Sequence, residues 1–142
     1  MKTILSVKNL KKYFSVKNSW GNDVALVKAL DGVDLEIESG KTFGIVGESG
    51  CGKTTLMRTL LRLVEPTSGS VVLSEEIVGK QGSSNKLEEL SSEELRKFRR
   101  KIGVVFQDPM GALNPRMIIK DIVSEPLVIH GKTDRIREKV IE

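Results

Sequence analysis

The segment Gly47-Glu48-Ser49-Gly50-Cys51-Gly52-Lys53-Thr54 fits the pattern G-x-x-x-x-G-K-[ST] of a phosphate-binding loop. The five residues before it, 42–46 (Thr-Phe-Gly-Ile-Val), form an apolar run that predicts a buried strand. After it, apolar residues recur at helical spacing over residues 54–64. A strand, a glycine-rich loop and a helix in this order are the context that the pattern requires, so the sequence predicts a nucleotide-binding site.

The residue types in the loop suit phosphate chemistry. Gly47, Gly50 and Gly52 allow the backbone to wrap closely around an anion. The loop amides and the positive end of the following helix would then face the phosphates. Lys53 would place its ammonium between the β- and γ-phosphates, and the Thr54 hydroxyl would bind Mg²⁺, which prefers oxygen ligands. The alternative is a glycine-rich surface turn, which the flanking strand and helix argue against.

The composition of the chain is ordinary. At 142 residues, of which 39% are hydrophobic, the chain is long enough to form one core. Much of the net charge of +4 comes from residues 96–101 (Arg-Lys-Phe-Arg-Arg-Lys), which favour a solvated helix face over a nucleic-acid surface. No apolar run is long enough to cross a bilayer, and the N-terminus lacks the pattern of a signal peptide. We therefore expect a cytoplasmic chain that can dock on a membrane partner.

The single cysteine and the single histidine limit the chemistry further. One cysteine excludes an internal disulfide and a cysteine cluster for zinc. Cys51 is interpreted as a small filler of the loop, with a reactive thiol as the alternative hypothesis. His130 stands alone beside a glycine and is given a structural role.

The rest of the sequence predicts an α/β protein. A tight hairpin turn is predicted at Leu30-Asp31-Gly32, and Ser91 with Glu94 predicts a capping box that begins a helix ending near Arg100. Further strands are predicted at residues 4–10, 24–27, 33–37, 69–73 and 102–106, and further helices at 117–124 and from about 133. This order indicates a strand-rich N-terminal layer and a parallel core sheet, with the ligand at the carboxyl ends of the core strands.

Several motifs resemble the ATP-binding cassette of ABC transporters. Residues 47–55 are similar to its Walker A loop, and 104–109 (Val-Val-Phe-Gln-Asp-Pro) resemble its Q-loop. Together with 113–117 and 124–127, they resemble the ATPases of oligopeptide and dipeptide permeases, whose relatives also serve nickel and glutathione importers. One departure is Ala112, where many relatives have serine. The resemblance implies a P-loop NTPase (RecA-like) core with an N-terminal antiparallel β layer over residues 1–108, and the beginning of the helical subdomain over 109–142.

The resemblance also implies roles for single residues. Gln107 would touch Mg²⁺ or the attacking water and sense the transmembrane partner, and its alternative role is a polar strand end. An aromatic residue would stack on adenine. Phe14 is favoured and Tyr13 remains open, and a core role for one of the two is the alternative. The implied catalytic residues are Lys53 and Gln107, the implied metal ligands are Thr54 and Gln107, and the implied nucleotide-binding residues are Phe14, Gly47, Glu48, Ser49, Gly50, Cys51, Gly52, Lys53, Thr54 and Thr55.

The implied function is ATP-driven import. The resemblance implies an ATPase subunit that uses ATP and Mg²⁺, lies on the inner face of the cell membrane, and pairs with transmembrane permease subunits and a second ATPase subunit, as a homo- or heterodimer. It contacts a solute-binding protein indirectly and is expected to bind no nucleic acid.

Other parts of a cassette are absent from the sequence. It contains no Leu-Ser-Gly-Gly-Gln signature and no Walker B, so an incomplete cassette is expected, inactive on its own. The alternatives are a non-hydrolysing nucleotide-binding module and a soluble ABC ATPase of DNA repair or translation. A small-molecule P-loop kinase is less favoured.

Overall fold

The computed structural model describes residues 2–79, 84–108, 111, 113–131, 138 and 140. The chain divides into two units, Met1–Gly103 and Val104–Glu142, each with its own internal contacts. The boundary after residue 108 that the sequence predicts stays a prediction. Pro109, Ala112 and most of the helix predicted from about residue 133 lie outside the described residues.

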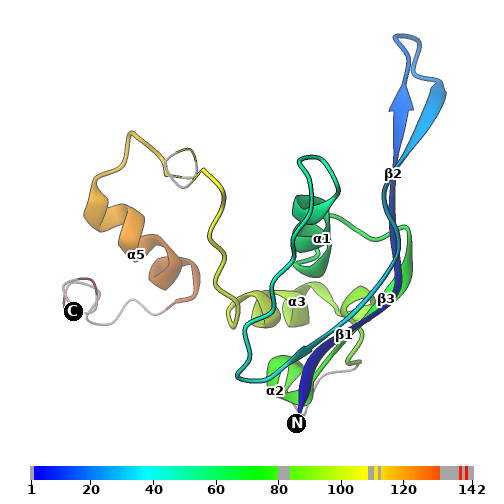
Figure 1. The fold of residues 1–142 in the computed structure, drawn as a ribbon. Helices are drawn as coiled ribbons and strands as arrows, with labels where there is room; N and C mark the ends of the chain where they lie inside the picture. The colour runs from blue at the N-terminus through cyan, green and yellow to red at the C-terminus, as the bar shows by residue number, and fades with distance from the viewer. Residues whose placement is uncertain are drawn as a thin grey trace. The chain divides into compact units, whose positions relative to one another are not determined.

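A three-stranded antiparallel sheet with the strand order β2-β1-β3 is the frame of the first unit (Figure 1). Its strands are β1 (Thr3–Lys17), β2 (Asp23–Glu38) and β3 (Ser68–Leu73). Apolar residues of all three strands lie in the core, where they are removed from water. The N-terminal antiparallel layer predicted from the sequence is confirmed.

The chain reverses between β1 and β2 at residues 18–22. There the Asn18 N–H donates to the Asn22 carbonyl at 2.9 Å. The predicted tight turn at Leu30-Asp31-Gly32 is therefore wrong, because β2 runs continuously through these residues. Gly32 has φ 87 within the strand, at a point where the register with β1 shifts, so it forms a bulge instead of a turn.

The core joins the strands to the helices of the first unit. These helices are α1 (Lys53–Leu60), α2 (Glu75–Val78), the 3₁₀ turn η1 (Leu87–Glu89) and α3 (Ser92–Arg99). The buried core residues are Val7, Leu10, Leu30, Leu56, Val71, Leu73, Leu87, Leu90 and Phe98. Leu56 anchors α1 to the strands, so the core fixes the loop that leads into α1.

The outer edge of β3 is covered by the segment before and within η1. The Leu73 N–H donates to the Asn85 carbonyl at 2.8 Å, and the Val71 N–H donates to Glu88 Oε2 at 3.2 Å. The Glu88 carboxylate and the Asn85 carbonyl thus accept the hydrogen bonds that a fourth strand would otherwise accept. Edge amides without acceptors could pair with a strand of another chain.

Helix α1 ends earlier than the sequence predicts. The predicted helix runs to residue 64, whereas α1 ends at Leu60. Arg62 has φ 51, and the Leu63 N–H donates to the Arg58 carbonyl at 2.8 Å. A left-handed residue after the last turn turns the chain away while satisfying a terminal carbonyl, which is how many helices end.

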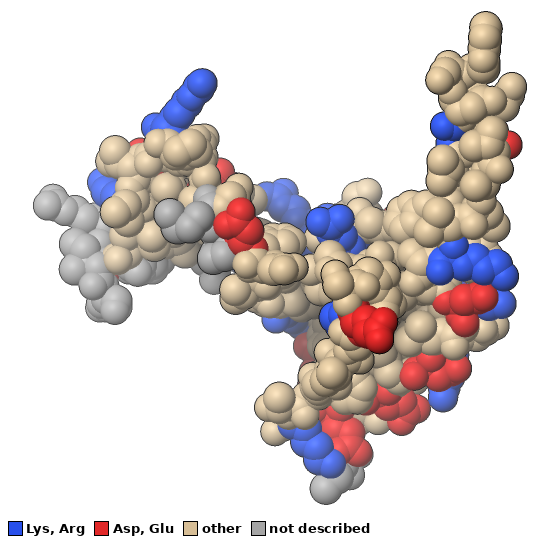
Figure 2. Space-filling model, turned by 45° about the horizontal axis from the view of Figure 1, so that its top comes forward, with Lys and Arg blue, Asp and Glu red and all other residues tan. Residues whose placement is uncertain are grey.

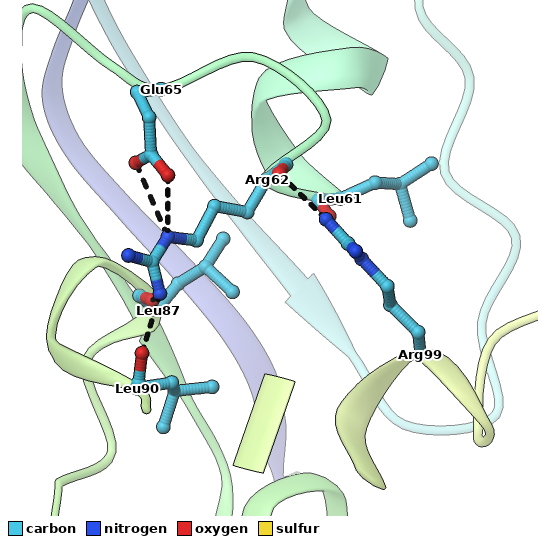
Figure 3. A network of polar contacts seen from close by, with 6 residues as sticks. All are labelled: Leu61, Arg62, Glu65, Leu87, Leu90 and Arg99. Atoms are coloured by element: carbon cyan, nitrogen blue, oxygen red, sulfur yellow. Dashed lines mark hydrogen bonds and ion pairs between the residues drawn. The ribbon is translucent and has the colours of Figure 1, made fainter. Parts of the chain in front are cut away.

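The Arg62 side chain ties this helix end to the segment around η1 (Figure 3). Its Nη1 donates to the Leu90 carbonyl at 2.6 Å and to the Leu87 carbonyl at 3.3 Å, while Nε lies 3.0 Å from Glu65 Oε1. Arg99 of α3 donates from Nη2 to the Arg62 carbonyl at 2.7 Å. Arg62 therefore donates to carbonyls of the segment around η1, and Arg99 donates to a carbonyl that follows the end of α1.

Two predicted core strands are not formed among the described residues. Residues 42–46 and 102–106 belong to no strand, and Val46 and Val105 are 98% and 90% exposed. The prediction of a parallel sheet from these runs is wrong for the described part of the chain. A strand needs a neighbouring ladder for its amides and carbonyls, whereas β1, β2 and β3 pair with one another.

The remaining helix predictions are close to the structure. The Ser91 hydroxyl accepts from the Glu94 N–H at 3.3 Å, and Glu94 Oε2 accepts from the Ser91 N–H at 2.9 Å, so the predicted capping box is confirmed. In the second unit, α5 spans Ile119–Ile129, beginning two residues later and ending five residues later than the predicted helix 117–124. None of the described helices is long and apolar enough to span a membrane.

Candidate nucleotide-binding site

The glycine-rich segment forms a loop that leads directly into α1. Ser49 and Gly50 lie in a turn, and Gly52 is the residue that precedes the first helical residue, Lys53. Gly50 and Gly52 have φ 81 and 98, in the left-handed region that glycine adopts without a steric penalty. The sequence therefore predicted both the loop and the need for glycine at these positions.

The loop wraps around the Lys53 ammonium. Lys53 Nζ donates to the Gly47 carbonyl at 2.6 Å and to the Glu48 carbonyl at 2.7 Å, and lies 3.4 Å from Cys51 Sγ. The Cys51 N–H donates to the Glu48 carbonyl at 3.3 Å, which closes the turn. The loop is thus curved around the lysine ammonium, and the predicted place of that ammonium between two phosphates stays a prediction.

The partial positive charge at the N-terminus of α1 is not offset by any side chain of the first turn. No side chain caps the helix at Gly52, and its first turn contains no acidic residue. The first hydrogen bond from the helix reaches Gly52 from Leu56, at 2.8 Å, so the amides of the first turn point out of the helix. Such a terminus favours an anion, because both the amides and the helix dipole present positive charge.

Close packing explains the glycine at position 52. A Cβ at Gly52 would lie 2.4 Å from the Ala29 carbonyl oxygen and 3.4 Å from Leu30 Cδ2. Ala29 and Leu30 belong to β2, so the start of α1 rests against the strand backbone. Sequence reasoning missed this contact, since nothing in the chain near Ala29 signals that a helix start will approach it.

The two threonines after the lysine lie in the first turn of α1. Thr54 is exposed, so its hydroxyl is at the surface of the loop. The Thr55 carbonyl accepts from the Thr59 hydroxyl at 2.8 Å, a bond within the helix. The predicted roles of Thr54 and Thr55 toward a ligand stay predictions.

The two aromatic candidates of β1 have different surroundings. Tyr13 donates from its hydroxyl to Asp31 Oδ1, and Lys28 Nζ lies 5.5 Å from its ring centroid. Phe14 is 40% exposed, with Lys12 Nζ 4.8 Å from its ring centroid. Because neighbouring residues of a strand point to opposite faces, only one of the two rings can face a ligand. The engaged hydroxyl of Tyr13 leaves Phe14 as the better candidate.

The Tyr13–Asp31 contact shifts both titrating groups. The hydrogen bond from Tyr13, with Lys28 and Lys11 nearby, lowers the pKa of the Asp31 carboxyl. The same hydrogen bond raises the pKa of the Tyr13 hydroxyl, with desolvation and the charge of Asp31 adding to it. Sequence reasoning missed this pair, whose members are 18 positions apart in the chain.

Gln107 belongs to the second unit and is exposed. The neighbouring Asp108 accepts from the Gly111 N–H at 3.1 Å. The structure brings together the loop, Lys53 and Thr54 within the first unit. The predicted meeting of Gln107 with them stays a prediction.

The basic run of residues 96–101 is largely used within the fold. Lys97 pairs with Glu93 at 2.7 Å, and Lys101 Nζ donates to the Glu76 carbonyl at 2.7 Å. Arg99 donates to the carbonyls at the end of α1 (Figure 3). Figure 2 shows acidic and basic side chains interspersed over the visible face of the first unit. The structural interpretation of this run is therefore favoured over a nucleic-acid surface.

The residues present fit a magnesium nucleotide. Lys53 offers positive charge, the uncapped first turn of α1 offers main-chain donors for phosphates, and Thr54 offers an oxygen ligand of the kind that Mg²⁺ accepts. Within the described residues, no group of three or more His, Cys, Asp or Glu side chains is placed to hold a metal by itself. A metal here would thus depend on phosphate oxygens and water for most of its ligands.

Comparison with known proteins gives the family. A model of the family described as ABC transporter matches residues 30–142. The chain is 43% identical over 143 residues to the oligopeptide transport ATP-binding protein AppF of Bacillus subtilis, covering 99% of this chain and 41% of that protein. It is 41% identical to the di/tripeptide transport ATP-binding protein DppF of Pseudomonas aeruginosa, covering 99% and 41%.

A solved structure has the same fold. It is the dimeric, post-hydrolysis state of the ATP-binding cassette MJ0796 bound to ADP and Pi, with a TM-score of 0.74 and 28% identity, covering 97% of this chain and 54% of that one. The chain spans about two fifths of the length of the two curated relatives. The fold class is that of a P-loop NTPase with an N-terminal antiparallel layer, and the chain belongs to the ABC transporter family.

Proposed function

We propose that this chain is part of the ATP-binding subunit of an ABC importer for oligopeptides or dipeptides, which couples the binding and hydrolysis of ATP to transport. The observation that carries the proposal is the loop of residues 47–52, which curves around the Lys53 ammonium at the uncapped start of α1. The names of two relatives at 43% and 41% identity, which specify oligopeptide and di/tripeptide transport, support peptides as the solute.

The loop residues would bind and orient the triphosphate. The main chain of residues 47–52 and the uncapped first turn of α1 would supply N–H donors, and Lys53 would add a mobile cation for the β- and γ-phosphates. Thr54 and Gln107 would hold Mg²⁺, which when bound offsets charge on the phosphate oxygens. Gln107 would also orient the attacking water, since an amide can accept and donate without fixing a proton.

Phe14 would bind the base. Its ring is partly exposed on β1, next in sequence to a tyrosine whose hydroxyl is already engaged by Asp31. A planar apolar ring can stack on adenine with little loss of side-chain entropy.

The implied partners follow from the family. The subunit would pair with a second ATPase subunit and with transmembrane permease subunits on the inner face of the membrane, and would meet a solute-binding protein only indirectly. The dimeric structure of the related cassette supports the pairing of two ATPase subunits.

The proposal is tested by nucleotide affinity in the full-length protein. Lys53→Ala removes the cation that the loop surrounds, and loss of a charged hydrogen-bond donor to the phosphates should weaken ATP–Mg²⁺ binding by about ten- to a hundredfold. Lys8→Ala is the matched control, because Lys8 forms an exposed ion pair with Glu36 at 3.7 Å on the sheet. Calorimetric titration measures both, and an unchanged affinity in Lys53→Ala would remove the basis for the site.

A further inference from the structure

The bulge in β2 opposite Tyr13 lies where the strand meets the phosphate-binding loop. Lys12 pairs with Leu30 and Tyr13 with Lys28, so Ala29 is the extra residue of β2 at this shift of register. The Ala29 carbonyl oxygen is the atom that a Cβ at Gly52 would approach to 2.4 Å. The bulge of β2 therefore lies against Gly52, the residue directly before α1.

Three side chains hold this bulge from the flanking positions. Tyr13 donates from its hydroxyl to Asp31, Lys28 Nζ lies 3.4 Å from Asp31 Oδ2, and the same ammonium lies 5.5 Å from the Tyr13 ring centroid. Lys28 and Asp31 stand directly before and after Ala29 and Leu30, the two residues that Gly52 meets. The three side chains thus contact one another beside the part of β2 on which the loop rests.

We infer that Tyr13, Lys28 and Asp31 form a clamp that positions the phosphate-binding loop through the Ala29 carbonyl and Gly52. They act as positioning residues that touch no phosphate themselves. This inference rests on the proposed nucleotide binding at the loop. It also gives two adjacent residues of β1 different roles. Tyr13 fixes the bulge, while Phe14 remains available to a ligand.

The contacts within the clamp differ in strength. Lys28 and Asp31 are exposed, with side-chain relative accessibilities of 57% and 47%, so their ion pair alone contributes little. The Tyr13 hydroxyl is a hydrogen-bond donor to a charged acceptor, which makes it the stronger contact. The sharpest perturbation is therefore removal of that hydroxyl with the ring kept.

The test measures the affinity of the full-length protein for two ligands that share the phosphate tail. Tyr13→Phe and Asp31→Asn are compared with the wild type by displacement of a fluorescent ATP analogue, using ATP–Mg²⁺ and base-free tripolyphosphate–Mg²⁺ as competitors. Each variant should weaken both competitors by the same factor, about two- to tenfold, as expected for loss of one hydrogen bond. The double variant should lose less than the product of the two single factors, because both changes weaken the Tyr13–Asp31 contact, and Asp31→Asn additionally weakens the contact with Lys28.

A matched control separates positioning from general weakening of the sheet. Ser6→Ala removes another side-chain contact between the same two strands, from Ser6 Oγ to Glu36 Oε1 at 3.4 Å, away from the bulge. Its melting temperature should change about as much as that of Tyr13→Phe, while its affinities stay at the wild-type values.

Three results would overturn the inference. They are wild-type affinities in Tyr13→Phe, additive losses in the double variant, and a loss for ATP without a loss for tripolyphosphate, which would place Tyr13 against the base. A wild-type protein that fails to bind ATP–Mg²⁺ would instead remove the proposed function, so the two failures are distinguishable.

Discussion

Replacing Gly52 by alanine tests whether the helix start rests on the β2 backbone. The variant carries two costs. Its φ of 98 is strained for any residue with a side chain, which costs about 1–2 kcal/mol. Its Cβ would also lie 2.4 Å from the Ala29 carbonyl oxygen, which forces the backbone to move and adds about 1–3 kcal/mol.

Two other glycines serve as controls that separate the steric cost at Ala29 from the conformational cost. Gly50 and Gly40 have φ 81 and 73, and a Cβ at either position would meet nothing within 4 Å. Gly50→Ala and Gly40→Ala should therefore lose only the conformational part of the free energy of unfolding. Gly52→Ala should lose clearly more than both.

The assay is urea unfolding without nucleotide, followed by far-ultraviolet circular dichroism. With a common slope, the midpoints order the variants by free energy of unfolding. If Gly52→Ala were no less stable than Gly50→Ala, the close approach of Ala29 to the loop would be refuted.

Three further predictions follow from other contacts. Arg62→Ala should lower the free energy of unfolding by about 1.5–3 kcal/mol in the same assay, because it removes a charged donor from the Leu90 carbonyl; recovery by Arg62→Lys would contradict the role of the planar guanidinium. The pKa of Asp31 is lowered in the folded state, so its contribution to stability is present above its ordinary value of 3.8 and lost as pH falls through the lower folded value. The difference in melting temperature between wild type and Asp31→Asn should accordingly vanish in strong acid, and a constant difference would contradict this. Alkylation of Cys51, which is exposed in the loop, should slow when ATP–Mg²⁺ is added; equal rates would argue against a phosphate site there.

Short-range features of the fold were predictable from the sequence. The capping box depends on Ser91 and Glu94, three residues apart, and the loop depends on glycines whose spacing fixes where left-handed residues stand. These features follow from local sterics and hydrogen bonds, so a single segment carries the information.

Features that depend on distant partners were not predictable. The sequence predicts a turn at Gly32, because a turn and a bulge have the same local sequence pattern and only the partner strand fixes the register. The apolar run 42–46 predicts a strand, yet a strand exists only where a second one pairs with it. The contacts of Tyr13 with Asp31 and of Gly52 with Ala29 join segments far apart in the chain, and no local pattern marks them.

The position of Trp20 decides what its fluorescence can report. It is the only tryptophan of these 142 residues, it is 88% exposed, and it lies in the turn that joins β1 and β2, at a projecting end with few charged side chains (Figure 2). Its indole is already hydrated in the native state, so the emission of Trp20 should barely change when the core melts. The same indole should shift toward shorter wavelength when another molecule covers the hairpin, which gives a label-free reporter of contact at that end.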